Sequence, residues 1–389
     1  MNEKLIIILD TLTKTFKVDE RNGLQRAMDG PLWKNDPNGI TLLELLGNIK
    51  DYSIFNNHLQ YLGNSGSNTT IENLADWLIN RSRFVGATKA ISELDFYMTS
   101  KEVEVDYIEP ILETISERDF EFVNGVKFLS ASNLRNKLFA NYIVAGWESS
   151  LIPMPRVIRC LSCSYMQTVQ HTSNLEYVAF PIQELPFEKT EDVRLCLSLA
   201  RSVEYGIFHI GSTSVAPDEF PFIHYISGWN VVPFKRQNIQ PHILEIEFKI
   251  ANDILNKFSK INPDFKEKLK IPLRKLNNYG SSESLVDKAI DLRICLESIF
   301  LTDGNTEQLR YRLSLRAALY LGSSLEERKE LFKLAKDVYD ITSSAVHNGK
   351  FSKKDKTELL DNGAMLAKKA LIKLIENGEI NWEDLELKN

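Results

Sequence analysis

The last turns of one long amphipathic segment, residues 338–349, contain a histidine in a position suited to chemistry. His347 is followed at once by Asn348 and Gly349, a pair that commonly ends a helix. The carbonyl end of a helix carries partial negative charge, which favours the protonated imidazolium. Such a side chain can transfer a proton or bind a phosphate, and it can equally cap the last carbonyls of its own helix.

Three arginines occupy the segment 306–321, which the apolar spacing predicts to be helical: Arg310, Arg312 and Arg316. At about 100° per residue, Arg312 and Arg316 fall among the leucines of this segment and not opposite them. A guanidinium on an inward face needs an anion, because an unpaired buried charge is costly. Two interpretations stay open: an internal ion pair with Glu297 or Asp340, or recognition of a ligand phosphate.

Four helices are expected to position these side chains, over residues 281–301, 306–321, 324–347 and 354–377. The third begins at Ser324 and Glu327, which have the spacing of a capping box. No proline occurs after Pro272, and the links between the helices are short. The pattern is typical of an antiparallel helical bundle.

The chain before this bundle has mixed character, so the protein is predicted to belong to the α+β class. Asn124-Gly125 lies between alternating apolar residues and predicts a β-hairpin over 119–129 with a two-residue type I′ turn. The region from about 119 to 243 is predicted to be β-rich, with short strands near 177–180 and 229–234, while residues 63–67 are predicted to form a loop. Helices are expected over 1–17, 41–50, 70–82, 190–203 and 244–258.

A domain boundary is predicted near 265–280. Residues 1–265 would form the mixed region, with a sensor or regulatory role, residues 266–280 a basic linker, and residues 281–389 the helical domain. Lys268, Lys270 and Arg274 of the linker could guide an RNA backbone towards the helical domain. The alternative is a solvated linker whose charges are partly balanced by neighbouring carboxylates.

Composition limits the classes of function. The 389 residues have a formal net charge of −6, so any nucleic-acid contact must come from a local basic patch. No apolar stretch reaches the ~18–20 residues needed to span a bilayer, and the first ten residues lack the features of a secretory signal. Four cysteines without a repeating framework are typical of a reducing compartment, so we expect a cytoplasmic protein without a membrane partner.

One pair of cysteines has the spacing of a zinc knuckle. Two residues separate Cys160 from Cys163, and His171 or Cys196 would have to complete the ligand set, because there is no second close pair. The same segment also has the pattern of a strand, which would place the two thiols on opposite faces. We therefore expect no metal and no cofactor.

Three separated segments, 290–301, 313–319 and 339–349, together resemble the HEPN superfamily, and in particular the HEPN domains of ApeA-like prokaryotic defence proteins. The resemblance covers about 281–376. It implies an all-helical domain that dimerises and brings together two copies of an Arg-x(4–6)-His motif as a metal-independent RNA-cleaving site. His347 would then act in proton transfer, and Gly349 matches the glycine that usually follows.

The motif arginine is absent from this sequence. Thr342 occupies its usual place, and the other two permitted positions hold Asp340 and Ile341. The Thr342 hydroxyl could donate one neutral hydrogen bond to a phosphate but cannot supply the charge-assisted fork of a guanidinium. Loss of such a charged group typically costs on the order of 10²–10³ in rate.

Two functions follow from the resemblance. In the first, Arg316 or Arg312 replaces the missing arginine beside Glu297, and the protein is an RNA-cleaving effector of antiviral defence whose N-terminal region responds to an unknown trigger. In the second, the domain is a non-catalytic module that holds a homodimer together or binds a partner.

Overall fold

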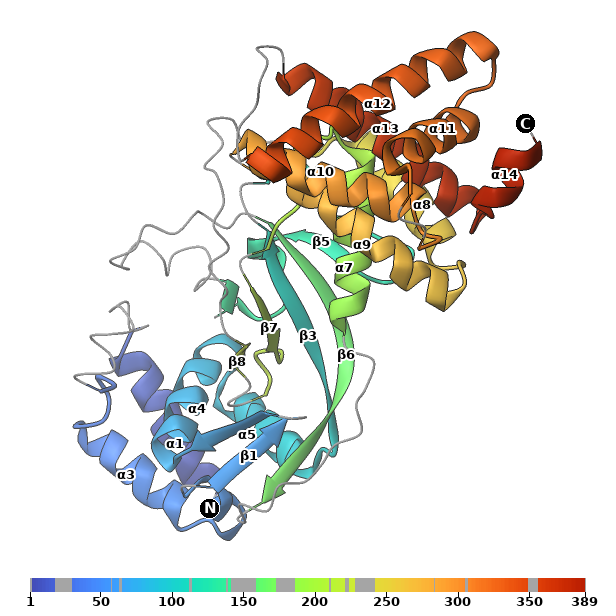
Figure 1. The fold of residues 1–389 in the computed structure, drawn as a ribbon. Coiled ribbons are helices and arrows are strands. Elements are labelled where there is room, and N and C mark those ends of the chain that lie inside the picture. The colour runs from blue at the N-terminus through green and yellow to red at the C-terminus, as the bar shows by residue number, and fades with distance from the viewer. Residues whose placement is uncertain are drawn as a thin grey trace. The chain divides into compact units, whose positions relative to one another are not determined.

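The computed structural model describes most of the chain, and Figure 1 draws its elements. The described residues are 2–17, 30–56, 58–62, 65–111, 114–137, 139–140, 159–172, 186–209, 211–220, 224–227, 242–282, 284–304, 307–348 and 356–388. Two compact units divide the chain: one comprises Met1–Pro110, Leu129–Phe187 and Gly211–Asn230, and the other Ile111–Phe128, Glu188–Ile210 and Val231–Asn389. Both units are therefore built from segments that are distant in sequence.

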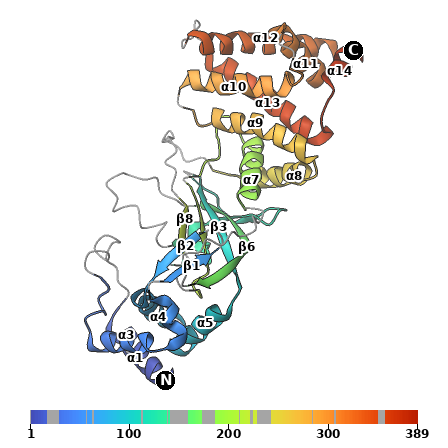
Figure 2. The same cartoon turned by 60° about the horizontal axis from the view of Figure 1, so that its bottom comes forward.

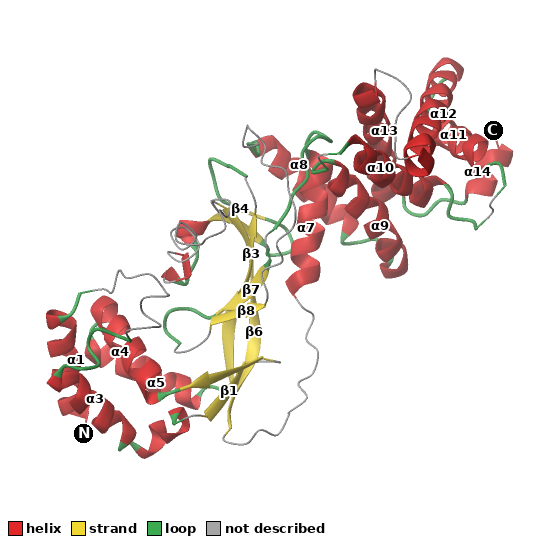
Figure 3. Ribbon diagram, turned by 60° about the vertical axis from the view of Figure 1, so that its left-hand side comes forward, coloured by secondary structure: helices red, strands yellow, loops and turns green. Residues whose placement is uncertain are grey.

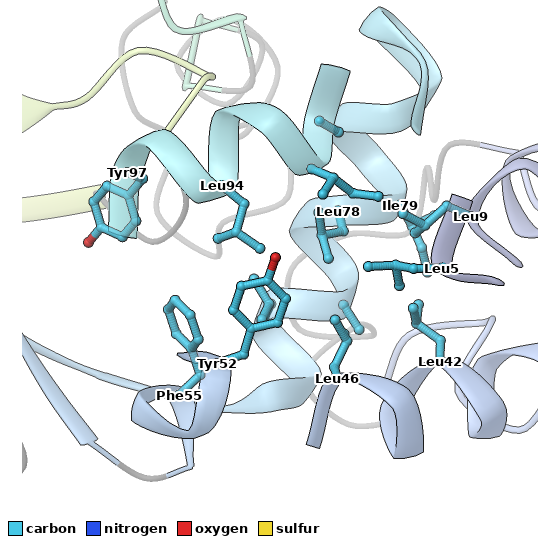
Figure 4. Packing of buried hydrophobic residues seen from close by; sticks show 14 of the residues in the cluster. Leu5, Leu9, Leu42, Leu46, Tyr52, Phe55, Leu78, Ile79, Leu94 and Tyr97 are labelled. Carbon is cyan, nitrogen blue, oxygen red and sulfur yellow. The ribbon is translucent and has the colours of Figure 1, made fainter. Parts of the chain in front are cut away.

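Helices make up one layer of the first unit: α1 (Asn2–Thr15), α3 (Pro37–Gly47), the 3₁₀-helix η1 (Lys50–Phe55), α4 (Ile71–Val85) and α5 (Ala87–Thr99). Asp36 and Thr70 cap α3 and α4 by accepting hydrogen bonds from Asn38 N and Asn73 N. The apolar faces of these helices meet in one core, and Figure 4 shows side chains from all five elements directed into it. Its fully buried members include Leu5, Leu9, Leu42, Leu46, Phe55, Leu78 and Leu94.

A sheet forms the other layer of this unit, with its strands in the order β2-β1-β6-β3-β7-β8. The strands are β1 (His58–Leu62), β2 (Ser65–Thr69), β3 (Glu102–Ile111), β6 (Arg159–Thr172), β7 (Ser212–Val215) and β8 (His224–Ser227), drawn in yellow in Figure 3. The pairs β1–β2, β1–β6, β3–β7 and β7–β8 are antiparallel. Val103, Val105 and Val169 of this sheet pack into the helical core.

The second unit is mainly helical. It contains α7 (Pro186–Ala200), α8 (Glu245–Phe258), α9 (Pro263–Tyr279), α10 (Leu285–Phe300), α11 (Leu309–Leu321), α12 (Leu325–Asn348), α13 (Lys356–Asn377) and α14 (Trp382–Lys388), of which α7 begins at the boundary between the units. Helix α10 contacts α9, α12 and α13, and Figure 2 shows it between α9 and α12. The predicted α+β class is thus confirmed, and none of the described helices is long and apolar enough to cross a membrane.

The predicted hairpin is confirmed, but its turn is of another type. Strands β4 (Phe120–Glu121) and β5 (Lys127–Ser130) are antiparallel, and Phe122 N donates to Val126 O at 2.8 Å, which leaves a three-residue loop. Only Gly125 of this loop has a positive φ, of 81°, so the loop has the geometry of a type I turn followed by a left-handed glycine. The ring of Phe120 stacks on Phe248 of α8 at 5.1 Å, and residues 120–128 of the hairpin belong to the second unit.

Several other secondary-structure elements differ from the predictions or lie outside the described residues. Residues 65–67 form part of β2, so the predicted loop over 63–67 is wrong there: His58–Leu62 supplies a partner strand that the polar sequence did not reveal. Helix α5, helix α9 and the short helix α14 were not predicted. The strands predicted near 177–180 and 229–234 lie outside the described residues.

The predicted basic linker over 266–280 is instead the body of helix α9, which packs on α10. Asn262 caps its N-terminus, and the helix continues through Pro272, which is buried. Arg274 donates to both carboxylate oxygens of buried Glu191 on α7, at 2.7 and 2.8 Å, and Lys270 is 3% exposed and pairs with Glu267. Lys268 pairs with Glu379 on the surface at 2.9 Å. These three cations therefore have carboxylate partners inside the unit, and the predicted role in guiding RNA has no support from their positions.

We predict that Arg274→Ala lowers the free energy of unfolding by about 2 kcal/mol, because it removes both hydrogen bonds that Arg274 donates to the buried carboxylate of Glu191. The matched variant Lys268→Ala removes an exposed pair and should change stability by less than about 0.5 kcal/mol. Urea denaturation of both variants measures the difference. Equal effects of the two substitutions would contradict the structural role assigned to Arg274.

Candidate functional site

The end of α12 is the site that the sequence singled out. His347 lies in the last turn of this helix, whose final residue is Asn348. The side chain of His347 and all of Gly349 lie outside the described residues. The site is therefore defined by the side chains that surround the preceding two turns of the helix.

Thr342 faces the interior of the bundle. The residue is 0% exposed, and its hydroxyl donates to Val338 O at 2.8 Å and to Tyr339 O at 3.1 Å. Val338 and Ala345, one turn before and after it, are also buried and belong to the same face. The hydroxyl predicted to contact a phosphate is thus bonded within its own helix and closed to solvent.

Arg293 of α10 lies against α12 one turn before Thr342. Its guanidinium carbon is 3.3 Å from the centre of the Tyr339 ring, and its Nη1 donates to Tyr339 O at 3.2 Å. Its Nε donates to Glu297 at 2.5 Å, four residues along α10. The side chain of Arg293 is only 13% exposed, so stacking and this carboxylate hold its charge close to the end of α12. Glu297, predicted as a supporting residue, is therefore the partner of Arg293 and not of Arg316.

Arg310 at the start of α11 forms an ion pair with Asp340 of α12. Both side chains are 47% exposed, so this pair lies at the surface of the unit. Asp340 occupies one of the three positions permitted for the motif arginine, and it presents negative charge there. Among the described arginines of α11, Arg310 is the one paired to the last turns of α12.

Arg312 and Arg316 are part of a separate network. Arg312 is paired with Asp303, and Arg316 donates to Asp303 at 2.7 Å, to Glu386 of α14 at 2.5 Å and to Phe300 O at 2.7 Å. Arg316 is 1% exposed, and Trp382 of α14 lies 5.8 Å from its guanidinium carbon. Burial alone lowers the pKa of Arg316, but its hydrogen bonds to the two carboxylates outweigh this effect and raise it.

Of the two interpretations of these arginines, the internal ion pair is the one observed for Arg316, although with carboxylates that were not predicted. Arg316 lies six residues after Arg310 on α11, or about 9 Å farther along the helix axis at 1.5 Å per residue. The described contacts therefore do not bring Arg316 together with the end of α12. The residues that do come together there are Arg293, Glu297, Arg310, Tyr339 and Asp340.

The cysteines give no metal site among the described residues, in which no group of His, Cys, Asp and Glu has the arrangement of metal ligands. Cys160 and Cys163 lie on β6, as the strand pattern predicted, and Cys196 lies on α7 of the other unit. All four thiols are buried, and burial raises the pKa of Cys160, Cys196 and Cys295.

Sequence reasoning missed Arg293 and Glu386. The spacing of Arg293 and Glu297, four residues apart in a predicted helix, was the signal for the first. Glu386 gave no signal, because α14 is a seven-residue helix that follows the predicted end of the bundle. Comparisons of the chain with protein-family models, with curated proteins and with solved structures gave no significant match.

Proposed function

We propose that the C-terminal helical unit is a non-catalytic module of the HEPN type, which holds a homodimer together and does not cleave RNA. One observation carries this proposal: position 342, where the motif arginine would stand, is closed inside the bundle with its hydroxyl bonded to its own helix. The cations chosen to replace the missing arginine support the same conclusion, because Arg312 and Arg316 are held by Asp303 and Glu386.

A second function remains a candidate because of Arg310. This arginine and Asp340 are half exposed, and the pair lies within two turns of His347 along α12. A phosphate could displace the carboxylate at such a surface pair at little cost, since exposed ion pairs contribute only about 0–1 kcal/mol. The protein would then be a metal-independent endoribonuclease acting in prokaryotic antiviral defence, with Arg310 as the phosphate ligand and His347 in proton transfer.

The cellular location is part of the proposal. Four buried cysteines without a repeating disulfide framework are typical of a protein kept in a reducing compartment, which supports the cytoplasm.

One experiment separates the two functions. Purified protein and the His347→Ala variant are incubated with total RNA in EDTA, and the molar mass of each is measured by light scattering. The non-catalytic module predicts intact RNA with both proteins and the mass of a dimer. Cleavage by the wild type that is lost in His347→Ala would establish the ribonuclease instead, and a monomeric mass would discard the dimer scaffold.

A further inference from the structure

A groove of about 750 Å³ opens on the surface of the first unit, and all of its lining residues belong to that unit. One wall is helix α5, which contributes residues 89, 92, 93 and 96, and another is the start of β3, at residues 102–104. Arg135, Met166 of β6 and the turn 217–220 complete it. The volume falls within the range of about 300–1,000 Å³ that is usual for ligand sites.

Aromatic and apolar side chains form part of this lining. Phe96 is 63% exposed and Met166 is 47% exposed, so two large apolar side chains of the same groove are open to solvent. The ring of Phe220 lies 6.3 Å from that of Phe96 and 5.8 Å from that of Tyr97, which is itself buried. Figure 4 shows Leu94 and Tyr97 of α5 directed into the hydrophobic core. Because this packing holds α5, the side of the helix that lines the groove is also held in position.

The charges of the groove are mostly negative. Together with their ion-pair partners, the lining residues comprise five carboxylates, Glu93, Glu102, Glu104, Asp106 and Glu219, and three cations, Arg81, Lys89 and Arg135.

Two of the three cations, Arg81 and Arg135, already form ion pairs with carboxylates of the protein. Arg135 donates to both oxygens of Asp106, at 2.8 and 2.9 Å, and also to Glu104, while Arg81 donates to both oxygens of Glu93. Glu219 is half exposed and lies 3.6 Å from Arg81. Glu102 is exposed and has no ion pair within the described part of the chain.

From this combination we infer that the groove binds a peptide segment of a partner protein, in which an apolar or aromatic anchor is flanked by lysine or arginine. The anchor would contact Phe96, Met166 and Phe220, and the flanking cations would pair with Glu102 and Glu219. An exposed aromatic face also attracts a cation directly. RNA is not the occupant that this surface fits, because excess carboxylates repel a phosphate backbone. This inference is independent of the function proposed for the helical unit.

The length of the groove favours a peptide over a compact small molecule. The helical wall from residue 89 to residue 96 is about 10 Å long at 1.5 Å per residue, which matches about three residues of extended chain.

The test is a positional-scanning library of hexapeptides, each with one fixed position, applied to the full chain. We expect selection of Phe, Trp, Leu or Met next to Lys or Arg, and rejection of Asp and Glu. A fluorescein-labelled peptide with the selected residues is then titrated by anisotropy. Phe96→Ala should weaken its binding at least tenfold, and Glu102→Lys with Glu219→Lys should weaken it at least as much, most strongly at low salt.

A matched control is Phe84→Ala on α4, since Phe84 is 67% exposed but does not line the groove. This variant should bind the peptide as the wild type does. Thermal unfolding followed by circular dichroism confirms that the variants fold, as expected for substitutions of exposed side chains. The inference is overturned if the library shows no selection, if acidic peptides are selected, or if the selected peptide binds Phe96→Ala as tightly as Phe84→Ala.

Discussion

Arg316→Ala is expected to lower the free energy of unfolding of the helical unit by about 4 kcal/mol, among the largest effects of any single substitution in this protein. The reason is that the guanidinium is 1% exposed and satisfies three acceptors at once: Asp303, Glu386 and Phe300 O. Removing it leaves Glu386 and Phe300 O without this donor, leaves Asp303 with Arg312 alone, and opens a cavity beside Trp382. Because Glu386 belongs to α14, the last helix should lose protection from hydrogen exchange first.

Two further variants define what Arg316 contributes. Arg316→Lys keeps the charge but lacks the planar guanidinium that reaches three acceptors at once. We therefore expect the free energy of unfolding to fall by about 2 kcal/mol. Arg310→Ala removes a pair whose members are both 47% exposed and should cost less than about 1 kcal/mol. Urea denaturation followed by circular dichroism measures all three. If Arg316→Ala were no more destabilising than Arg310→Ala, the guanidinium would not be the structural cation described above.

The four helices of the C-terminal bundle could be predicted because each of them has a recognisable pattern in its own stretch of sequence. α10, α11, α12 and α13 all begin and end within a few residues of the predicted bounds, since amphipathic spacing and capping residues are properties of short windows of sequence. The serine at the start of α12 behaves as expected, with Ser324 Oγ accepting from Glu327 N at 3.1 Å. The carboxylate of Glu327 accepts instead from Ser323, one residue before the predicted partner.

Elements that depend on distant partners were not predictable in the same way. The residues of β2, Ser65–Thr69, include no large apolar side chain, and they form a strand because β1 lies beside them. α9 contains Pro272, and a proline inside a segment is ordinarily a sign of a break in a helix. Its packing depends on distant partners, because Lys266 and Arg274 pair with Asp192 and Glu191, which lie 74 and 83 residues earlier in the chain.

The candidate site shows the same division. Sequence periodicity correctly placed Arg316 on an inward face, because the helical period alone determines that. It could not identify the counter-charge, since Asp303 lies in a loop and Glu386 in a helix that local pattern did not reveal. The burial of Thr342 likewise depends on how α12 rotates against α10 and α13, which no single segment determines.

The second large effect concerns Thr342, and it tests the family resemblance most directly. Thr342→Arg restores the residue that the motif would have at this position. Since the position is 0% exposed and no carboxylate is bonded to its hydroxyl, the new guanidinium would be buried without a partner in a space fitted to threonine. We expect a loss of at least about 4 kcal/mol, or failure of the helical unit to fold.

Thr342→Val is the matched variant. Valine has nearly the same shape and omits only a hydroxyl that bonds back to carbonyls of its own helix, so the change in stability should stay within about 1 kcal/mol.

Both variants are compared by urea denaturation and by incubation with total RNA in EDTA. A Thr342→Arg protein that folds as stably as Thr342→Val and cleaves RNA, with cleavage abolished by adding His347→Ala, would show that position 342 can reach a substrate. In that case the bundle could form a ribonuclease site once the arginine is restored, and only the natural sequence, with Thr342, would be non-catalytic. Loss of folding in Thr342→Arg alone means instead that core packing, and not the absence of one charged group, separates this helix from an active site.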